Sequence, residues 1–170
     1  MIHALLARRL FDGERFLADR AVLAIVGPGE VPAEARCAVL ADDEILAPSY
    51  VDLQVNGGGG VLLNDDVTPA AMAALAAAHR ALGTGALLPT LISGAPGQIA
   101  AALAALATPP PGVAGLHLEG PALAPARRGI HPAAALRPLA EAEIAALCAG
   151  PRQLLLTLAP ETVPQGTIAR

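Results

Sequence analysis

The spacing of apolar positions changes after residue 47, and the later part of the chain alternates between two kinds of segment. Short apolar runs bounded by Gly and Pro are typical of buried strands, and the alanine-rich segments between them are typical of helices. The predicted strands cover residues 50–55, 86–88, 113–119 and 153–158, and the predicted helices cover residues 68–82, 97–107 and 140–149. This order predicts an α/β fold with a parallel sheet, either a barrel or a doubly wound sheet.

In both of these architectures ligands bind at the carboxyl ends of the strands. The predicted ends are Asn56, Pro89, Glu119 and Pro160. Residues 1–47 differ, because short apolar runs there are separated by turn signals and no helical period is sustained. We expect a small β unit with strands at residues 21–26 and 37–40, and a domain boundary at Pro48.

Composition narrows the classes of function. The apolar fraction of 54% is inflated by alanine, and no run approaches the roughly 18 apolar residues of a spanning helix. We therefore expect no membrane partner, and because a net charge of −4 gives no basic footprint we expect no nucleic-acid partner. The N-terminal apolar segment is too short for a secretory signal, so a cytoplasmic location is expected. All 11 basic residues are arginine, which excludes a Walker A loop, a Schiff-base lysine and a carboxylated lysine bridging two metals. Cys37 and Cys148 form no CxxC motif and are expected to be free thiols.

The first strand of the later part has an unusual polar face. Asp52, Gln54 and Asn56 alternate with apolar residues, whereas a strand buried in a parallel sheet is usually apolar on both faces. Three polar residues on one face indicate a polar barrel interior or a site, or else an edge strand with a solvated face.

His117 and Glu119 precede Gly120-Pro121, a pair that ends a strand, and they share one strand face. A metal ion, a substrate or a structural ion pair would each offset the cost of burying them. Glu is a suitable ligand for Zn²⁺, Fe²⁺ or Mn²⁺, but one ligand does not make a site. His131 follows Arg127-Arg128-Gly129, a loop that either contacts an anionic substrate or is solvated.

Five segments, taken together, resemble the N-acetylglucosamine-6-phosphate deacetylases of the amidohydrolase superfamily. They are PSYVDLQVNGGGG at 48–60, AHRALGTGALLPTLIS at 78–93, GLHLEGP at 115–121, RGIH at 128–131 and TLAPE at 157–161. The resemblance implies the first half of a (β/α)₈ TIM-type barrel over residues 48–170, preceded by part of a small β domain over residues 1–47. It also implies metal-dependent conversion of N-acetylglucosamine 6-phosphate to glucosamine 6-phosphate and acetate.

The resemblance also assigns residues. Glu119 matches the carboxylate metal ligand, and Ile130 and His131 match positions that contact the sugar. Gln54-Val-Asn56 stands where many amidohydrolases have His-x-His, which favours a single divalent metal, Zn or Fe, with Gln54 and Asn56 as possible site-lining residues. His117 has no role in the family pattern and is expected to support the barrel. Family members are commonly dimers.

The family's metal-binding histidines and catalytic aspartate lie on later strands, so no catalytic residue is assigned in this chain. From Pro48 onward the chain has about half of the roughly 250 residues of a complete barrel. We therefore expect an N-terminal portion that is inactive alone. The alternatives are a non-catalytic remnant or interaction module of the same fold, and another amidohydrolase.

Overall fold

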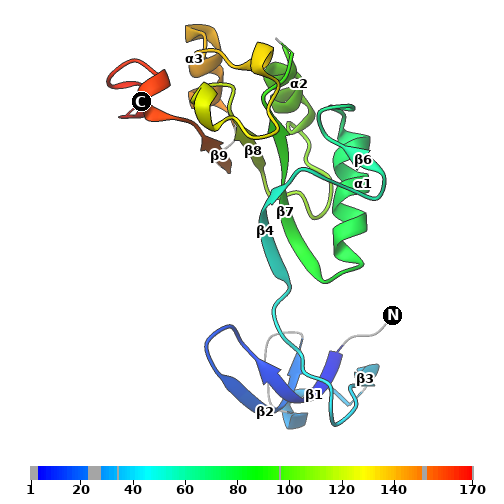
Figure 1. Cartoon of the computed structure of the whole chain (residues 1–170). Coiled ribbons are helices and arrows are strands. Elements are labelled where there is room, and N and C mark those ends of the chain that lie inside the picture. The colour runs from blue at the N-terminus through cyan, green and yellow to red at the C-terminus, as the bar shows by residue number, and fades with distance from the viewer. Residues whose placement is uncertain (1–3, 23–27, 34, 96, 151–152, 170) are drawn as a thin grey trace. The chain divides into compact units, whose positions relative to one another are not determined.

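The computed structural model describes residues 4–22, 28–33, 35–95, 97–150 and 153–169, and the chain divides into two compact units. The first unit comprises residues 1–49 and the second residues 50–170 (Figure 1). Residues 23–26 of the predicted strand 21–26 lie outside the described ranges.

The first unit holds a three-stranded sheet in the order β2-β1-β3. β1 (Ala4–Phe11) pairs antiparallel with β2 (Phe16–Val22) and parallel with β3 (Cys37–Val39), and a 3₁₀ turn, η1, covers Pro28–Glu30. The hairpin turn is closed by Asp12, whose Oδ1 accepts hydrogen bonds from the amides of Glu14 and Arg15, both at 2.9 Å. Sequence reasoning did not predict β1, because Arg8-Arg9 interrupts its apolar pattern, and it placed the start of β2 too late.

The second unit is built on four parallel strands in the order β4-β7-β8-β9. The strands are β4 (Tyr50–Val55), β7 (Thr84–Ile92), β8 (Leu116–Glu119) and β9 (Leu154–Thr157). The helices between them are α1 (Pro69–Arg80), α2 (Gln98–Ala105) and α3 (Glu141–Ala149). Minor elements are β5 (Gly57–Gly58), β6 (Val61–Leu62) and the 3₁₀ turns η2 (Pro125–Arg127), η3 (Ala133–Ala135), η4 (Pro160–Thr162) and η5 (Thr167–Ala169). The predicted α/β fold with a parallel sheet is confirmed.

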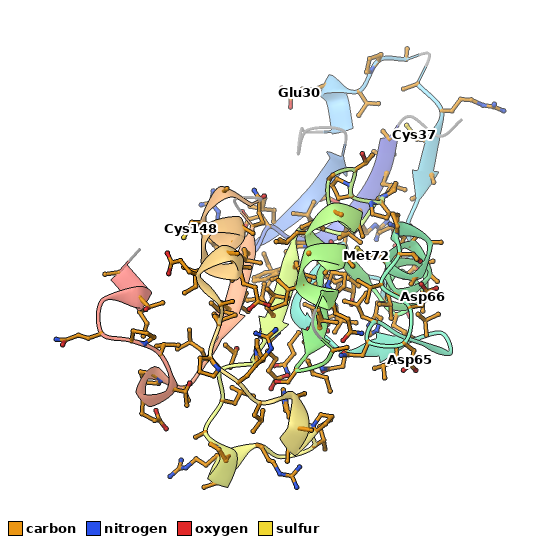
Figure 2. All side chains as sticks on the ribbon, turned by 90° about the horizontal axis from the view of Figure 1, so that it is seen from above. Glu30, Cys37, Asp65, Asp66, Met72 and Cys148 are labelled. Atoms are coloured by element: carbon orange, nitrogen blue, oxygen red, sulfur yellow. The ribbon has the colours of Figure 1, made fainter. Side chains whose placement is uncertain are left out.

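Helix α1 begins where the sequence predicts. Thr68 is the N-cap, its Oγ1 accepts a hydrogen bond from the amide of Ala71 at 3.2 Å, and Pro69 occupies the first helical position. α1 packs alongside β7 (Figure 1). Two of its side chains, Leu75 and Met72, are fully buried, and Met72 is labelled in Figure 2. The apolar core continues beneath β7 and β8 with Leu87, Leu116 and Leu118.

The predicted end of the second strand at Pro89 is wrong, because β7 continues to Ile92. Proline lacks the amide that a ladder hydrogen bond requires, so a proline inside a strand usually marks an irregularity. Here Pro89 pairs with Val55, and the register between β4 and β7 shifts between Asp52 and Val55. The β4–β7 pairing is therefore irregular next to Pro89, and β7 continues for three residues beyond the proline.

Both faces of β4 are largely exposed, since the apolar Val51 and Leu53 are accessible as well as the polar Gln54. At the other end of the sheet, β9 borders an apolar groove of about 650 Å³. It is lined by α3 and the residue stretch just before it, by β9 and by the segment after β9. The lining includes Leu139, Ile144, Leu147, Leu154, Leu156 and Ile168. Among the helices that the structure describes, none is long and apolar enough to cross a bilayer. Cys37 and Cys148 are free and exposed.

Candidate functional site at the carboxyl ends of the strands

Glu119 is the last residue of β8, and two side chains distant in sequence approach its carboxylate. Gln54 Nε2 on β4 donates a hydrogen bond to Oε2 at 3.2 Å, and His131 Nε2 lies 3.6 Å from Oε1. The Glu119 side chain is 24% exposed, so the carboxylate borders solvent rather than being sealed in the core. The structure therefore brings together three of the residues that sequence analysis singled out.

His131 belongs to the loop that follows β8 and is only 4% exposed. The loop closes on itself, because the His131 amide donates to Arg128 O at 3.0 Å and Arg128 Nη1 donates to His131 O at 2.7 Å. Arg128 thus holds the loop backbone. The neighbouring Ile130 is 83% exposed, so its side chain faces solvent while His131 faces Glu119.

Ser93 is the residue at this site that sequence reasoning missed. It follows β7 directly, it is 3% exposed, and its Oγ lies 2.9 Å from His131 Nδ1. The residue was overlooked because the strand was expected to end at Pro89. The pairing of Ile92 with Glu119 shows that the true end of β7 is level with the end of β8. A strand continued to Ile92 would have placed Ser93 at the functional edge.

A set of amide contacts braces the end of β7. Asn64 exchanges two hydrogen bonds with the Ile92 backbone: Oδ1 accepts from Ile92 N at 3.0 Å and Nδ2 donates to Ile92 O at 2.9 Å. Gln98 Nε2 in turn donates to Asn64 O at 2.8 Å. These bonds tie β7 to the loop before α1, on which Figure 2 labels Asp65 and Asp66, and to the first residue of α2.

His117 shares the β8 face with Glu119 but contacts the two neighbouring strands. Nδ1 lies 3.2 Å from Thr90 Oγ1 on β7, and Nε2 lies 2.8 Å from Thr157 Oγ1 on β9. Burial lowers the pKa of His117 below its usual value, against an opposing influence of the Glu119 charge. A buried imidazole held by two hydroxyls is what a supporting role in the sheet requires.

Asn56 follows β4 directly and is half-buried. Its carbonyl accepts the Leu63 amide at 3.4 Å, which closes the β5–β6 hairpin onto the strand end. The same hairpin is held by His79, whose Nε2 lies 3.1 Å from Gly57 O. A Cβ at Gly58 would lie 2.7 Å from that nitrogen, so the glycine run allows the hairpin to approach α1.

Comparison with known proteins relates this arrangement to one group of enzymes. Over 130 residues the chain is 41% identical to an N-acetylgalactosamine-6-phosphate deacetylase of Shewanella sp. (strain ANA-3), covering 74% of this chain and 33% of that protein. Over 175 aligned positions it is 36% identical to an N-acetylgalactosamine-6-phosphate deacetylase of Escherichia coli O157:H7, covering 95% of this chain and 45% of the relative. It is 35% identical to the human N-acetylglucosamine-6-phosphate deacetylase, covering 69% of this chain and 31% of that protein. The chain is related to the amino sugar 6-phosphate deacetylases.

Solved structures of these deacetylases agree with this relationship. The N-acetylglucosamine-6-phosphate deacetylase of Pasteurella multocida superimposes with a TM-score of 0.83 at 24% identity, over 95% of this chain and 46% of that one, and shows the shared fold. The N-acetyl-D-glucosamine-6-phosphate deacetylase of Mycobacterium smegmatis gives a TM-score of 0.74 at 28% identity, over 98% of this chain and 49% of that one. The α/β structure with its parallel sheet is consistent with part of a TIM-type barrel. No family model matches the chain.

The chain spans between about a third and a half of the length of the relatives described above. Glu119 is a suitable oxygen ligand for a divalent metal, since its carboxylate is partly exposed and has only neutral or titratable neighbours. Within the described ranges, however, no group of three His, Cys, Asp or Glu side chains is placed to hold a metal ion. The described residues therefore fit one ligand of such a site and not a complete site.

Proposed function

We propose that this chain forms one wall of the active site of a metal-dependent deacetylase acting on an N-acetylhexosamine 6-phosphate. The observation that carries the proposal is the convergence of Gln54, Glu119 and His131 at the carboxyl edge of the parallel sheet. That edge is where barrel enzymes assemble their sites. The relationship to amino sugar 6-phosphate deacetylases supports amide hydrolysis as the class of reaction.

In this reaction water adds to the acetamide carbonyl carbon, the carbon–nitrogen bond breaks, and the leaving nitrogen takes up a proton. The products are acetate and the amino sugar 6-phosphate. Glu119 would supply one ligand to a divalent metal, Zn or Fe, which when bound polarises the carbonyl and lowers the pKa of a water molecule. Gln54 would orient the Glu119 carboxylate, and His131 and Ile130 would contact the sugar.

The further metal ligands and the acid–base group that protonates the nitrogen are proposed to come from outside the described residues. Two features support this. Glu119 has no further pair of ligating side chains around it in the described part of the chain. The sheet also has accessible edges, with β4 exposed on both faces and β9 bordering an apolar groove. Additional strands would cover that apolar surface and add side chains to the same edge.

Two epimeric sugars, N-acetylglucosamine 6-phosphate and N-acetylgalactosamine 6-phosphate, are candidate substrates. Sequence analysis favoured N-acetylglucosamine 6-phosphate, whereas the Shewanella and Escherichia coli relatives are named for N-acetylgalactosamine 6-phosphate. The two substrates differ only in the configuration at C4. We propose the shared class as the substrate, with cytoplasmic location and a dimeric assembly as accompanying predictions.

The proposal is tested with a chimera in which this chain is joined to the remaining part of the Escherichia coli relative. We expect the purified chimera to release acetate from at least one of the two N-acetylhexosamine 6-phosphates and to hold stoichiometric metal. The matched variant Glu119→Gln should lose both, whereas Glu161→Gln, at an exposed position in η4, should keep both. A folded chimera that binds no metal and hydrolyses neither substrate would refute the proposal.

The alternative is a non-catalytic remnant or interaction module, and one observation favours it: the incomplete ligand set around Glu119 in the described ranges. The chimera distinguishes the two hypotheses, because only a chain that contributes Glu119 to an active site gives a metal-binding, active chimera, and metal analysis of the isolated 170-residue chain adds a one-sided test. Stoichiometric Zn²⁺ or Fe²⁺ retained by the isolated chain and lost in Glu119→Gln would argue against the remnant. We expect the isolated chain to show no turnover in either case.

A further inference from the structure

Ser93 makes two contacts with the same nitrogen of His131. Its backbone amide donates to His131 Nδ1 at 3.3 Å, and its hydroxyl oxygen lies 2.9 Å from that nitrogen. The hydroxyl also lies 3.4 Å from the backbone oxygen of Glu119, but its single proton is donated to one acceptor only, and Nδ1 is the nearer of the two. Ser93 therefore stands between the imidazole and the strand that carries the carboxylate.

The backbone amide decides which ring nitrogen carries the proton. An amide N–H only donates, so Nδ1 must accept and must be unprotonated. In the neutral ring the proton then lies on Nε2, the nitrogen 3.6 Å from Glu119 Oε1. The opposite tautomer would place two N–H groups against each other at Nδ1.

The residues on either side of Ser93 fix its position. Asn64 holds the preceding residue, Ile92, through both its amide and its carbonyl. On the other side, a Cβ added at Gly120 would overlap Ser93 Oγ, and Gly120 has a positive φ of 86°. The glycine after Glu119 thus leaves the space that the serine hydroxyl occupies.

We infer that Ser93 is a positioning residue that holds His131 as the Nε2–H tautomer, with its N–H directed at the Glu119 carboxylate. His131 then acts as a hydrogen-bond donor at this site and not as a metal ligand, because Nδ1 is engaged by Ser93 and Nε2 carries a proton. Any contribution of Ser93 to catalysis rests on the proposed function. The tautomer itself is a property of the chain alone.

The test is a two-bond ¹H–¹⁵N correlation spectrum of the ¹⁵N-labelled 170-residue chain at neutral pH, without metal or substrate. Such spectra distinguish protonated from unprotonated ring nitrogens, and His131→Gln identifies the His131 signals among the four histidines. We expect an unprotonated Nδ1 and a protonated Nε2. A protonated Nδ1 in the wild-type chain would overturn the inference.

Two variants at Ser93 separate the hydroxyl from the backbone amide. In Ser93→Ala we expect the Nδ1–H tautomer of His131 to rise by about five- to tenfold relative to Nε2–H, the effect of losing one hydrogen bond. Ser93→Thr keeps a hydroxyl and should keep the wild-type pattern. An unchanged His131 pattern in a folded Ser93→Ala chain would refute the role of the hydroxyl.

Thr157→Val is the matched control, because it removes a hydroxyl 2.8 Å from the other buried histidine, His117. It should move the His117 signals and leave those of His131 in place. The His117 signals also report folding in the Ser93 variants, and if they are lost the wild-type tautomer still decides the inference. Since no metal or substrate is present, failure of the deacetylase proposal would leave this result standing.

Discussion

Gln54 and Glu119 are 65 residues apart in sequence, yet the Gln54 amide donates to the Glu119 carboxylate at 3.2 Å. The two residues lie on β4 and β8, which are separated in the sheet by β7. Next-nearest strands are about 10 Å apart, a gap that two long side chains on the same face can span. The contact shows that the polar face of β4 is directed at the end of β8.

The first prediction concerns that contact. Gln54→Glu would place a second carboxylate beside Glu119, so we expect the free energy of unfolding to fall by about 0.5–1 kcal/mol through like-charge repulsion. Gln54→Ala removes a partly solvated hydrogen bond and should cost about 0.5 kcal/mol. Urea denaturation at low and high salt measures both. The effect of Gln54→Glu should shrink at high salt because salt screens exposed charges, and a salt-independent loss would contradict the explanation.

The second prediction concerns His117 as a support between strands. His117→Ala would leave a cavity and remove both hydroxyl contacts of the ring, and we expect it to cost about 2–4 kcal/mol. Thr157→Val keeps the volume and should cost about 1 kcal/mol. Chemical denaturation followed by circular dichroism gives both values. A His117→Ala variant as stable as the wild type would show that the sheet does not depend on this residue.

The third prediction is a pH dependence at the start of α3. Two hydrogen bonds from Arg137, at 2.6 and 2.7 Å, hold the pKa of Glu143 below its usual value, and the Ala140 amide adds to the effect. Because the folded pKa is below the unfolded one, the unfolded state binds more protons as the pH falls. The contribution is therefore fully present above about pH 4.5 and is lost as the pH decreases through the folded pKa.

The measurement is the free energy of unfolding between neutral and acidic pH, compared with Glu143→Gln. The variant should lose roughly 1 kcal/mol at neutral pH and show a shallower acid dependence. Arg137→Gln removes the same ion pair from its other side and should also give a shallower slope. Equal slopes for Glu143→Gln and the wild type would contradict the assignment.

The fourth prediction concerns the N-cap of α1. Thr68→Ala removes the side-chain acceptor of the Ala71 amide, and we expect a loss of about 1 kcal/mol. Thr68→Ser keeps the hydroxyl and should be within a few tenths of a kcal/mol of the wild type. Thermal denaturation separates the three proteins. If Thr68→Ser lost as much as Thr68→Ala, the hydroxyl would not be the reason for the preference.

The sequence by itself determined the elements whose signals are local. Thr68 and Pro69 set the start of α1, and the residues of β4 were predicted with its observed bounds, because capping and strand patterns depend on adjacent residues. The order of strands and helices determined the parallel sheet and placed Glu119 at its carboxyl edge. The roles of Glu119, Ile130 and His131 in binding stay predictions.

Only the tertiary structure decided the relations between segments. Whether β7 continues past Pro89 depends on the irregular register of its neighbour β4, which no local pattern reports. That continuation brings Ile92 level with Glu119 and places the next residue, Ser93, against His131. The burial of His131 beside an exposed Ile130 follows from how the loop after β8 closes. The contacts of Gln54 with Glu119, of Arg128 with His131 and of Ser93 with His131 join residues 65, 3 and 38 positions apart. They form because the whole unit packs in one way, and the local propensities of the chain do not determine them.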